Sequence, residues 1–305
     1  MSFTSKAGVV GAGVFGAYHA AKYAQMANVV FVGVYDPHPD RAQSVVDRFG
    51  GRVFSDLDQL IAATNLISVT TPASAHGRVG LQVIAAGNHV YIEKPLASTL
   101  QDADAIVSAA AQRGLVAACG FLERATFEAM GLNALPQAPI RMESVRNGVA
   151  SPRNLDVSVV LDLMIHDIDL ALTLAQSEPL TVEAEGRTRV HASFDEAKAE
   201  VMFISGLIAT LAVNRVAPVR ERTMKLTYPV GEIFVDFVAN RIENSTPFAL
   251  NHDFERTAGG ADRLGASLAA FVSAVRQERP GPLASAADGA RALELALAVE
   301  QAIVT

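Results

Sequence analysis

The sequence predicts an α/β protein with two domains: an N-terminal doubly wound parallel sheet and a C-terminal α+β domain with a mostly antiparallel open sheet. Residues 1–121 alternate strand-like apolar runs with helix-like segments through short connections, which is typical of a parallel sheet covered on both faces. Residues 180–237 contain successive strand-like runs without helices between them, which indicates antiparallel pairing. A length of 305 residues also favours two domains, which we place at residues 1–121 and 122–305.

The first apolar run leads directly into a glycine-rich turn, GAGVFG, and a helix-like segment follows. Gly11 can take the positive φ that a tight turn needs, Gly13 leaves room for a pyrophosphate, and Gly16 lets the helix pack close to the sheet. The N–H groups at the helix N-terminus then attract phosphates. This order is the layout of a Rossmann dinucleotide-binding unit. We therefore expect cofactor contacts from Gly11, Gly13, Val14, Phe15 and Gly16.

The next apolar run ends on an acidic residue, Asp36, which lies 20 residues after Gly16. An acid at this place hydrogen-bonds the adenosine ribose hydroxyls, and it would repel a 2′-phosphate. The sequence therefore favours NAD over NADP, with Arg41 as the nearest arginine that could offset the acid. The alternative is that the glycines only shape a turn and that Asp36 caps the next helix.

The remaining elements follow from apolar runs and helix-end signals. Gly50 closes a helix that starts at Pro39, and Thr99 with Asp102 three residues later can cap another. In the first domain we expect strands at 7–10, 29–35, 53–54, 66–70, 89–92 and 115–118, and helices after the glycine turn and at 39–49, 57–63, 73–86 and 99–114. In the second domain we expect strands at 140–147, 181–190, 197–204, 207–216, 222–228 and 231–237, and helices at 125–135, 161–175, 264–277 and 286–303. Residues 240–260 lack periodicity and predict a long loop.

Composition and charge exclude several classes of protein. The net charge is −7 and no cluster of Lys and Arg stands out, which argues against nucleic-acid binding. No apolar run reaches about 18 residues, which argues against a membrane span. The single cysteine, Cys119, excludes a disulfide framework, and no signal peptide is visible at the start. We expect a cytoplasmic protein.

A lysine lies at the carboxyl end of one predicted parallel strand, in the sequence Glu93-Lys94-Pro95. Ligands of open α/β sheets bind at these strand ends. A lysine there can orient a hydroxyl group and stabilise a developing alkoxide, although a solvated loop lysine would give the same pattern. After the preceding strand, Thr70, Thr71, Pro72 and His76 are placed to line the nicotinamide ribose, but a turn and a helix start explain them almost as well.

The segment LDLMIHDIDL combines an imidazole with carboxylates at helical spacing. Asp162 lies four residues before His166, and Asp169 lies three residues after it, so a helix puts all three on one face. A histidine beside a carboxylate is a general acid/base. A metal site would need a further ligand, and we expect none. The alternative is a surface charge cluster, as we expect for Asp167 unless it pairs with a nearby basic residue. His19, His38, His89, His191 and His252 show no partner pattern.

Together, GAGVFG, Asp36, TPASAH, AGNHVYIEKPLA and DLMIHDIDL resemble the Gfo/Idh/MocA oxidoreductases over essentially the whole chain. This resemblance implies a Rossmann domain and a second domain whose open sheet often mediates homodimer or homotetramer contacts. It also implies that Lys94, Asp162 and His166 lie at the reacting centre.

The segments GFLER and DVSVVLDLMIHDID resemble the branch that contains UDP-N-acetylglucosamine 3-dehydrogenases. We therefore expect NAD-dependent oxidation of a secondary hydroxyl on a sugar, specifically a nucleotide-activated or amino sugar. His166 would remove the hydroxyl proton, Lys94 would stabilise the oxygen, and Asp162 would position substrate or imidazole. Substrate contacts are further expected from Arg124, Arg153 and Asn154. The alternatives are an inositol or free-aldose dehydrogenase, or a non-catalytic dinucleotide sensor.

Overall fold

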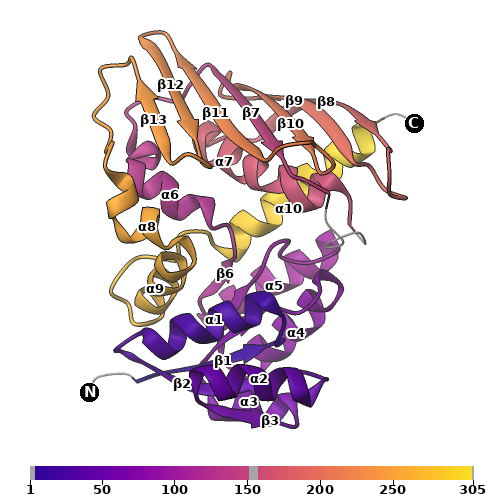
Figure 1. The fold of residues 1–305 in the computed structure, drawn as a ribbon, viewed down its shortest axis with the longest axis vertical. Coiled ribbons are helices and arrows are strands. Elements are labelled where there is room, and N and C mark those ends of the chain that lie inside the picture. The colour runs from indigo at the N-terminus through magenta and orange to yellow at the C-terminus, as the bar shows by residue number, and fades with distance from the viewer. Residues whose placement is uncertain (1–3, 151–156, 304–305) are drawn as a thin grey trace. The chain divides into compact units, whose positions relative to one another are not determined.

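The computed structural model describes residues 4–150 and 157–303, and the chain forms two compact units. Unit 1 comprises residues 1–125 and 262–290, and unit 2 comprises residues 126–261 and 291–305. Figure 1 labels most of the helices and strands of both units. Each unit contains one sheet, and the predicted fold class is confirmed.

Unit 1 contains a six-stranded sheet in the order β3-β2-β1-β4-β5-β6, and every described pair in it is parallel. This is the Rossmann strand order, which reverses direction between β1 and β4 and places a ligand crevice at that point. The strands are β1 (Ser5–Val10), β2 (Val29–Tyr35), β3 (Arg52–Phe54), β4 (Leu66–Val69), β5 (His89–Ile92) and β6 (Ala117–Cys119).

The helices of unit 1 end where the sequence supplies caps and glycines. Asp56 accepts the N–H of Asp58, and Thr99 accepts the N–H of Asp102, at 2.6 and 3.1 Å. Gly50, with φ of +80°, ends the second helix in a conformation that other residues rarely adopt. The helices are α1 (Val14–Gln25), α2 (Pro39–Phe49), α3 (Leu57–Ala63), α4 (Ala73–Ala85), α5 (Leu100–Arg113) and α9 (Arg263–Val275).

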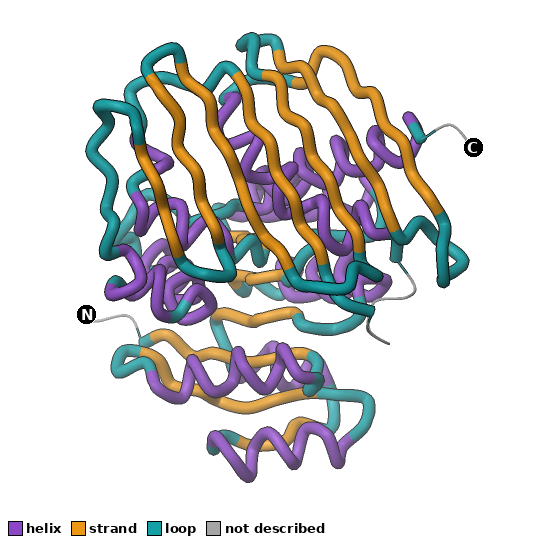
Figure 2. The backbone as a smooth tube through the Cα atoms, turned by 45° about the horizontal axis from the view of Figure 1, so that its top comes forward, coloured by secondary structure: helices purple, strands orange, loops and turns teal. Residues whose placement is uncertain are grey.

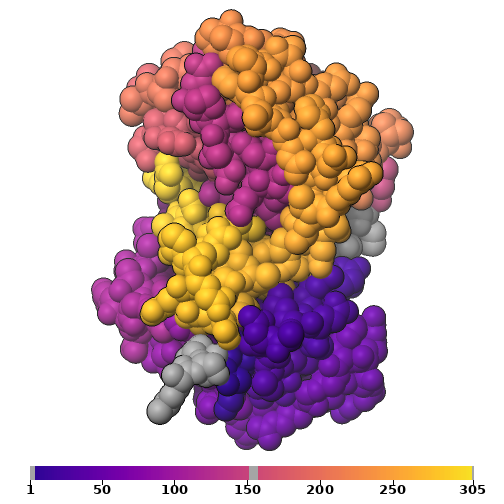
Figure 3. Space-filling view, turned by 90° about the vertical axis from the view of Figure 1, so that its left-hand side faces the viewer, coloured from indigo at the N-terminus to yellow at the C-terminus, as the bar shows by residue number. Residues whose placement is uncertain are grey.

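Helix α9 comes late in the chain but packs into the core of unit 1. Its buried apolar face, with Leu268 and Phe271, joins one cluster with Tyr23 and Tyr91, and the hydroxyl groups of Tyr91 and Ser267 lie 2.9 Å apart. Figure 3 shows this late segment in yellow against the early residues in indigo. The contiguous division expected from the sequence put residues 262–290 with the second domain. An amphipathic pattern reveals that a helix has a buried face, but not which core receives it.

Unit 2 contains a seven-stranded sheet in the order β13-β12-β11-β7-β10-β9-β8. Figure 2 shows its strands side by side. All neighbouring pairs are antiparallel except β7 and β10, which are parallel. Gly206, with φ of +90°, makes the turn between β9 and β10. The strands are β7 (Arg141–Asn147), β8 (Pro179–Arg187), β9 (Glu196–Phe203), β10 (Ile208–Asn214), β11 (Glu221–Tyr228), β12 (Gly231–Asp236) and β13 (Arg241–Asn244).

One face of this sheet packs on helix α7 (Ile165–Ala175), which follows a π-helical turn at Val160–Met164. Every second side chain along β9 is buried, and those between are partly or fully exposed, as a sheet with one core-facing side requires. The other described helical segments are α6 (Glu123–Met130), α8 (Ala258–Ala261), α10 (Ala286–Ala302) and short 3₁₀ turns at Leu132–Ala134 and Phe254–Arg256. Among the residues that the structure describes, no helix is long and apolar enough to cross a membrane.

Several expected elements differ from the structure in type or bounds. The prediction of a long loop at residues 240–260 was wrong, because this segment contains β13, a 3₁₀ turn and α8. The expected helix at 125–135 instead ends at Met130, because Gly131 takes φ of +86° and interrupts it. The strand expected at 115–118 is shifted to Ala117–Cys119.

Candidate active site

The glycine turn between β1 and α1 has the geometry of a phosphate cradle. Gly11 has φ of +98°, and a Cβ on Gly16 would lie 1.9 Å from the backbone oxygen of Gly11. A Cβ on Gly13, by contrast, would meet nothing within 4 Å. The protein's own packing therefore requires Gly11 and Gly16, whereas the space beside Gly13 is open to a ligand. Val14 begins α1, so its first-turn N–H groups are available to a phosphate at this opening.

Asp36 ties the end of β2 to the glycine turn. Its two carboxylate oxygens accept the N–H groups of Ala12 at 2.6 Å and His38 at 2.8 Å. Asp36 does not cap the next helix, because the N-cap residue of α2 is His38 and no side chain caps that helix. Each carboxylate oxygen accepts more than one hydrogen bond, so a ribose hydroxyl can still donate to Asp36. A groove beside it is lined by Gly13, Arg41 and neighbouring residues of α1 and α2.

Thr70, Glu93 and Lys94 follow the strands β4 and β5 at the edge where the glycine turn follows β1. Thr70 donates its hydroxyl to the carbonyl of Gly11 at 2.8 Å, and the N–H of Glu93 donates to the carbonyl of Val69 at 3.0 Å. The peptide bond between Lys94 and Pro95 is cis. The fold thus brings together the glycine turn, Thr70 and Lys94, as the position of these residues after parallel strands predicts.

His76 connects the loops that follow β4 and β5. Its side chain is buried, with Nδ1 2.7 Å from the carbonyl oxygen of Pro95 and Nε2 2.9 Å from that of Thr71. Burial lowers the pKa of His76, against hydrogen bonds to these carbonyls that raise it. A neutral imidazole donates from one nitrogen at a time. The ring of His76 lies between the two loops and can donate to one carbonyl oxygen at a time, and its expected contact with the cofactor remains a prediction, as do those of Thr71 and Pro72.

In unit 2, Asp162 and His166 lie on consecutive helical turns. Asp162 belongs to the π turn, where its N–H donates to the carbonyl of Ser158 at 2.9 Å, and His166 lies in the first turn of α7. The hydroxyl of Ser158 accepts the N–H of Leu161 at 3.2 Å and so caps the start of the turn. Single π turns within helices are frequent at functional sites. The expected helix is confirmed, with this wider first turn added.

Asp167 pairs with a basic residue, as the sequence left open. Nε and Nη2 of Arg146, on β7, donate to its two carboxylate oxygens at 2.8 and 2.9 Å. Both side chains are buried. This bidentate pair anchors α7, and with it His166, to the centre of the sheet.

The predicted catalytic and substrate-binding residues lie in different parts of the chain. Lys94 belongs to unit 1, whereas Asp162 and His166 belong to unit 2, so their joint action remains a prediction. Arg124 lies in unit 1 with Nη2 3.4 Å from a carboxylate oxygen of Asp288. Arg153 and Asn154 lie outside the described residues.

Two histidines that show no partner pattern in the sequence have carboxylate partners in the structure. His19 contacts Glu93, and His191 contacts the buried Asp195 at 2.5 Å. The sequence signal for the second pair was its spacing of four residues. The signal for the first was the periodicity of α1, where Gly16, His19 and Tyr23 recur on the buried face.

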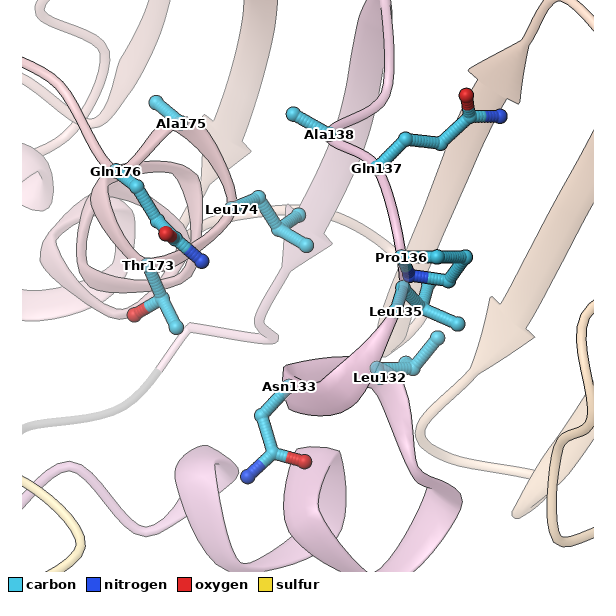
Figure 4. Close-up of a pocket in the computed structure, with 10 residues that line it drawn as sticks. All are labelled: Leu132, Asn133, Leu135, Pro136, Gln137, Ala138, Thr173, Leu174, Ala175 and Gln176. Atoms are coloured by element: carbon cyan, nitrogen blue, oxygen red, sulfur yellow. The ribbon is translucent and has the colours of Figure 1, made fainter.

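A pocket on unit 2 lies between residues 132–138 and the C-terminal end of α7 (Figure 4). Its lining contains the neutral polar side chains of Asn133, Gln137, Thr173 and Gln176, with leucines around them. It contains no general acid or base, and it lies at the end of α7 opposite His166. Across residues 4–150 and 157–303, no group of three or more His, Cys, Asp or Glu side chains is arranged to hold a metal ion.

Comparison with known proteins places this geometry in a family context. Residues 5–121 match the profile of the oxidoreductase family with an NAD-binding Rossmann fold, and residues 141–233 match the GFO/IDH/MocA C-terminal domain. The chain is 33% identical to UDP-N-acetylglucosamine 3-dehydrogenase of Acidithiobacillus ferrooxidans over 98% of this chain and 97% of that one. A solved structure of that dehydrogenase has a TM-score of 0.89 at 32% identity and covers 99% of this chain and 98% of its own. Inositol 2-dehydrogenase of Acidothermus cellulolyticus is 30% identical over 62% of this chain and 59% of its own.

Proposed function

The chain belongs to the Gfo/Idh/MocA oxidoreductase family, and from this premise we propose that it oxidises a secondary ring hydroxyl of a nucleotide-activated amino sugar. It carries the NAD-binding Rossmann domain of that family, and the predicted cofactor is confirmed. The observation that supports the substrate class is the likeness to a UDP-N-acetylglucosamine 3-dehydrogenase along nearly the full length of both chains. UDP-N-acetylglucosamine is therefore the first substrate to test.

The residues of unit 1 fit the cofactor. The open space beside Gly13 admits a pyrophosphate, the first-turn N–H groups of α1 face it, and Asp36 can accept from the adenosine ribose. NAD supplies the hydride acceptor when it is bound. The glycine turn follows β1 and Lys94 follows β5, with β4 between these two strands of the same sheet, and this arrangement would place a lysine close to the nicotinamide end of the cofactor.

In the proposed reaction the carbon that bears the hydroxyl loses a hydride and the hydroxyl oxygen loses a proton, which leaves a ketone. His166 accepts the proton as general base, a contribution of about 10²–10⁴-fold. The ammonium group of Lys94 donates to the same oxygen and stabilises its developing negative charge. Asp162, one turn before His166, orients the imidazole or a neighbouring hydroxyl of the sugar.

The test is the rate of NADH formation with a panel of UDP-sugars, free aldoses and inositols. We expect turnover with UDP-N-acetylglucosamine and at most weak turnover with the others. The likeness to an inositol 2-dehydrogenase favours inositols as the second candidate, and faster turnover of an inositol would select it. Binding of NAD without turnover of any panel member would favour a dinucleotide sensor.

A homodimer or homotetramer formed through the sheet of unit 2 is part of this proposal. The face of the sheet away from α7 carries exposed side chains such as Glu183, Lys198 and Glu200. Light scattering after gel filtration should report a dimer or tetramer, and reversal of charge at Lys198 and Glu200 should shift it toward the monomer. A wild-type monomer would contradict this assembly.

A further inference from the structure

Four buried polar side chains form a continuous hydrogen-bonded chain inside unit 1. The hydroxyl of Tyr23 lies 2.7 Å from Oγ of Ser68, which lies 2.9 Å from Nδ1 of His19. Nε2 of His19 lies 2.9 Å from a carboxylate oxygen of Glu93. Tyr23, His19 and Ser68 are fully buried, and Glu93 is 8% exposed. Buried polar groups in such a chain are costly unless every one is satisfied.

One assignment of protons satisfies all three contacts. Burial raises the pKa of Tyr23 and outweighs its hydrogen bond to Ser68, so the phenol keeps its proton and donates to Ser68. Ser68 can then donate to Nδ1 of His19, and Nε2 is the donor on the other side of the ring. Nε2 donates to Glu93, which as a carboxylate only accepts. Each donor in the chain thus points toward Glu93.

This chain connects three elements that meet at the cofactor edge. His19 lies on α1, the helix that starts at the glycine turn, and Ser68 lies on the central strand β4. Glu93 directly follows β5 and directly precedes Lys94. The backbone of Gly120 also packs close to the carboxylate, since an added Cβ there would lie 2.9 Å from it. The side chain of Glu93 is therefore held by the bond to His19 and by close packing against Gly120.

We propose that His19 is a positioning residue, which holds Glu93 and so fixes Lys94 relative to the glycine turn. The inference rests on the proposed role of Lys94 at the substrate oxygen. The N-terminus of α1 would bind the pyrophosphate, and the lysine lies in the segment that follows β5. A hydrogen bond between α1 and this segment therefore sets the distance from the cofactor to the lysine. A displacement of about 1 Å at a reacting group can lower a rate about 10²-fold, so a fixed distance matters for turnover.

Two amide substitutions at His19 separate this role from simple core packing. His19→Gln places an amide N–H near the position of Nε2 and keeps the bond to Glu93, but it loses the bond to Ser68. His19→Asn places its amide near Nδ1, keeps the bond to Ser68 and loses Glu93. Each variant leaves one partner unsatisfied, so each serves as the stability control for the other.

The experiment compares crystal structures of wild type and both variants with NADH bound, together with kcat, KM and NADH affinity. We expect Lys94 to keep its place in His19→Gln and to shift in His19→Asn. We expect kcat to fall about 10²-fold in His19→Asn but only about tenfold in His19→Gln, with the affinity for NADH unchanged in both variants. Equal positions of Lys94 in the two variants would overturn the proposal.

The structural comparison decides the matter even if no sugar is turned over. A wild-type enzyme that fails with every substrate would contradict the proposed function and leave the lysine displacement measurable. A normal wild-type enzyme whose two variants lose equal activity would contradict the positioning role alone.

Discussion

Substituting Asp167 with asparagine would remove the charge from one half of the buried ion pair that anchors α7 to β7. Asp167 accepts two hydrogen bonds from Arg146 at 2.8 and 2.9 Å, and the two residues are 2% and 1% exposed. The pair is bidentate and shielded from water, so the buried guanidinium of Arg146 would lose the charge of the carboxylate that it contacts through two nitrogens.

Breaking a buried ion pair from one side costs about 3–5 kcal/mol, which raises the unfolding constant by about 10²–10⁴-fold. Urea unfolding followed by circular dichroism measures this loss. The matched control is Glu243→Gln on β13 of the same unit. There Oε1 of Glu243 lies 3.1 Å from Nη1 of Arg241, and both side chains are 59% exposed. An exposed pair of this kind contributes about 0–1 kcal/mol, so the control should unfold almost as wild type does.

A double variant, Arg146→Met with Asp167→Leu, replaces both charges with apolar groups. It should recover most of the stability lost in Asp167→Asn, because no buried charge remains. The reasoning is refuted if Asp167→Asn costs no more than Glu243→Gln, or if the double variant is less stable than the single one.

Three further predictions follow from the local geometry. Gly13→Ala should leave thermal stability unchanged but abolish NADH binding. Gly16→Ala should destabilise the free protein, because the added Cβ would lie 1.9 Å from the backbone oxygen of Gly11. Calorimetry measures the stability of each variant, and NADH titration measures its cofactor binding. Burial lowers the pKa of His89, whose Nδ1 accepts the N–H of Val116 at 2.9 Å, so the unfolded chain protonates His89 more readily than the folded one does. The protein should therefore lose stability as the pH falls below about 6.5, and His89→Asn should weaken this pH dependence in melting curves. Burial would raise the pKa of Asp195, but hydrogen bonds to its carboxylate outweigh burial and hold the pKa well below its ordinary value. The carboxylate therefore stabilises the fold above about pH 4, and this effect is lost as the pH falls further. Asp195→Asn should lower the urea midpoint at neutral pH and flatten the loss of stability at acid pH.

The parts of the fold that were predicted well are those with local signals. The helix at Pro39–Phe49 and the strand at Val29–Tyr35 have the predicted bounds, because a proline, a glycine and a β-branched run mark their ends and type. The glycine turn after β1 was equally visible, since its glycines act through backbone geometry close to their own positions.

The parts that were missed depend on partners far away in the chain. Strand β13 has one buried apolar residue, Ile242, and is a strand because β12 pairs with it. The parallel pairing of β7 with β10 follows from a crossover that no local pattern reveals. The link between His19 and Glu93 spans 74 residues, so helical periodicity could show that His19 is buried but not what it contacts.

The most direct test of the proposed function measures NADH formation from UDP-N-acetylglucosamine by wild type, His166→Ala and Lys94→Ala, with NADH affinity measured alongside. We predict that wild type turns over and that each variant loses about 10²–10⁴-fold in kcat while it still binds NADH. Turnover near the wild-type rate in either variant would contradict the assignment of general base or oxygen-stabilising lysine. Absence of turnover in wild type, with NADH bound, would contradict the substrate.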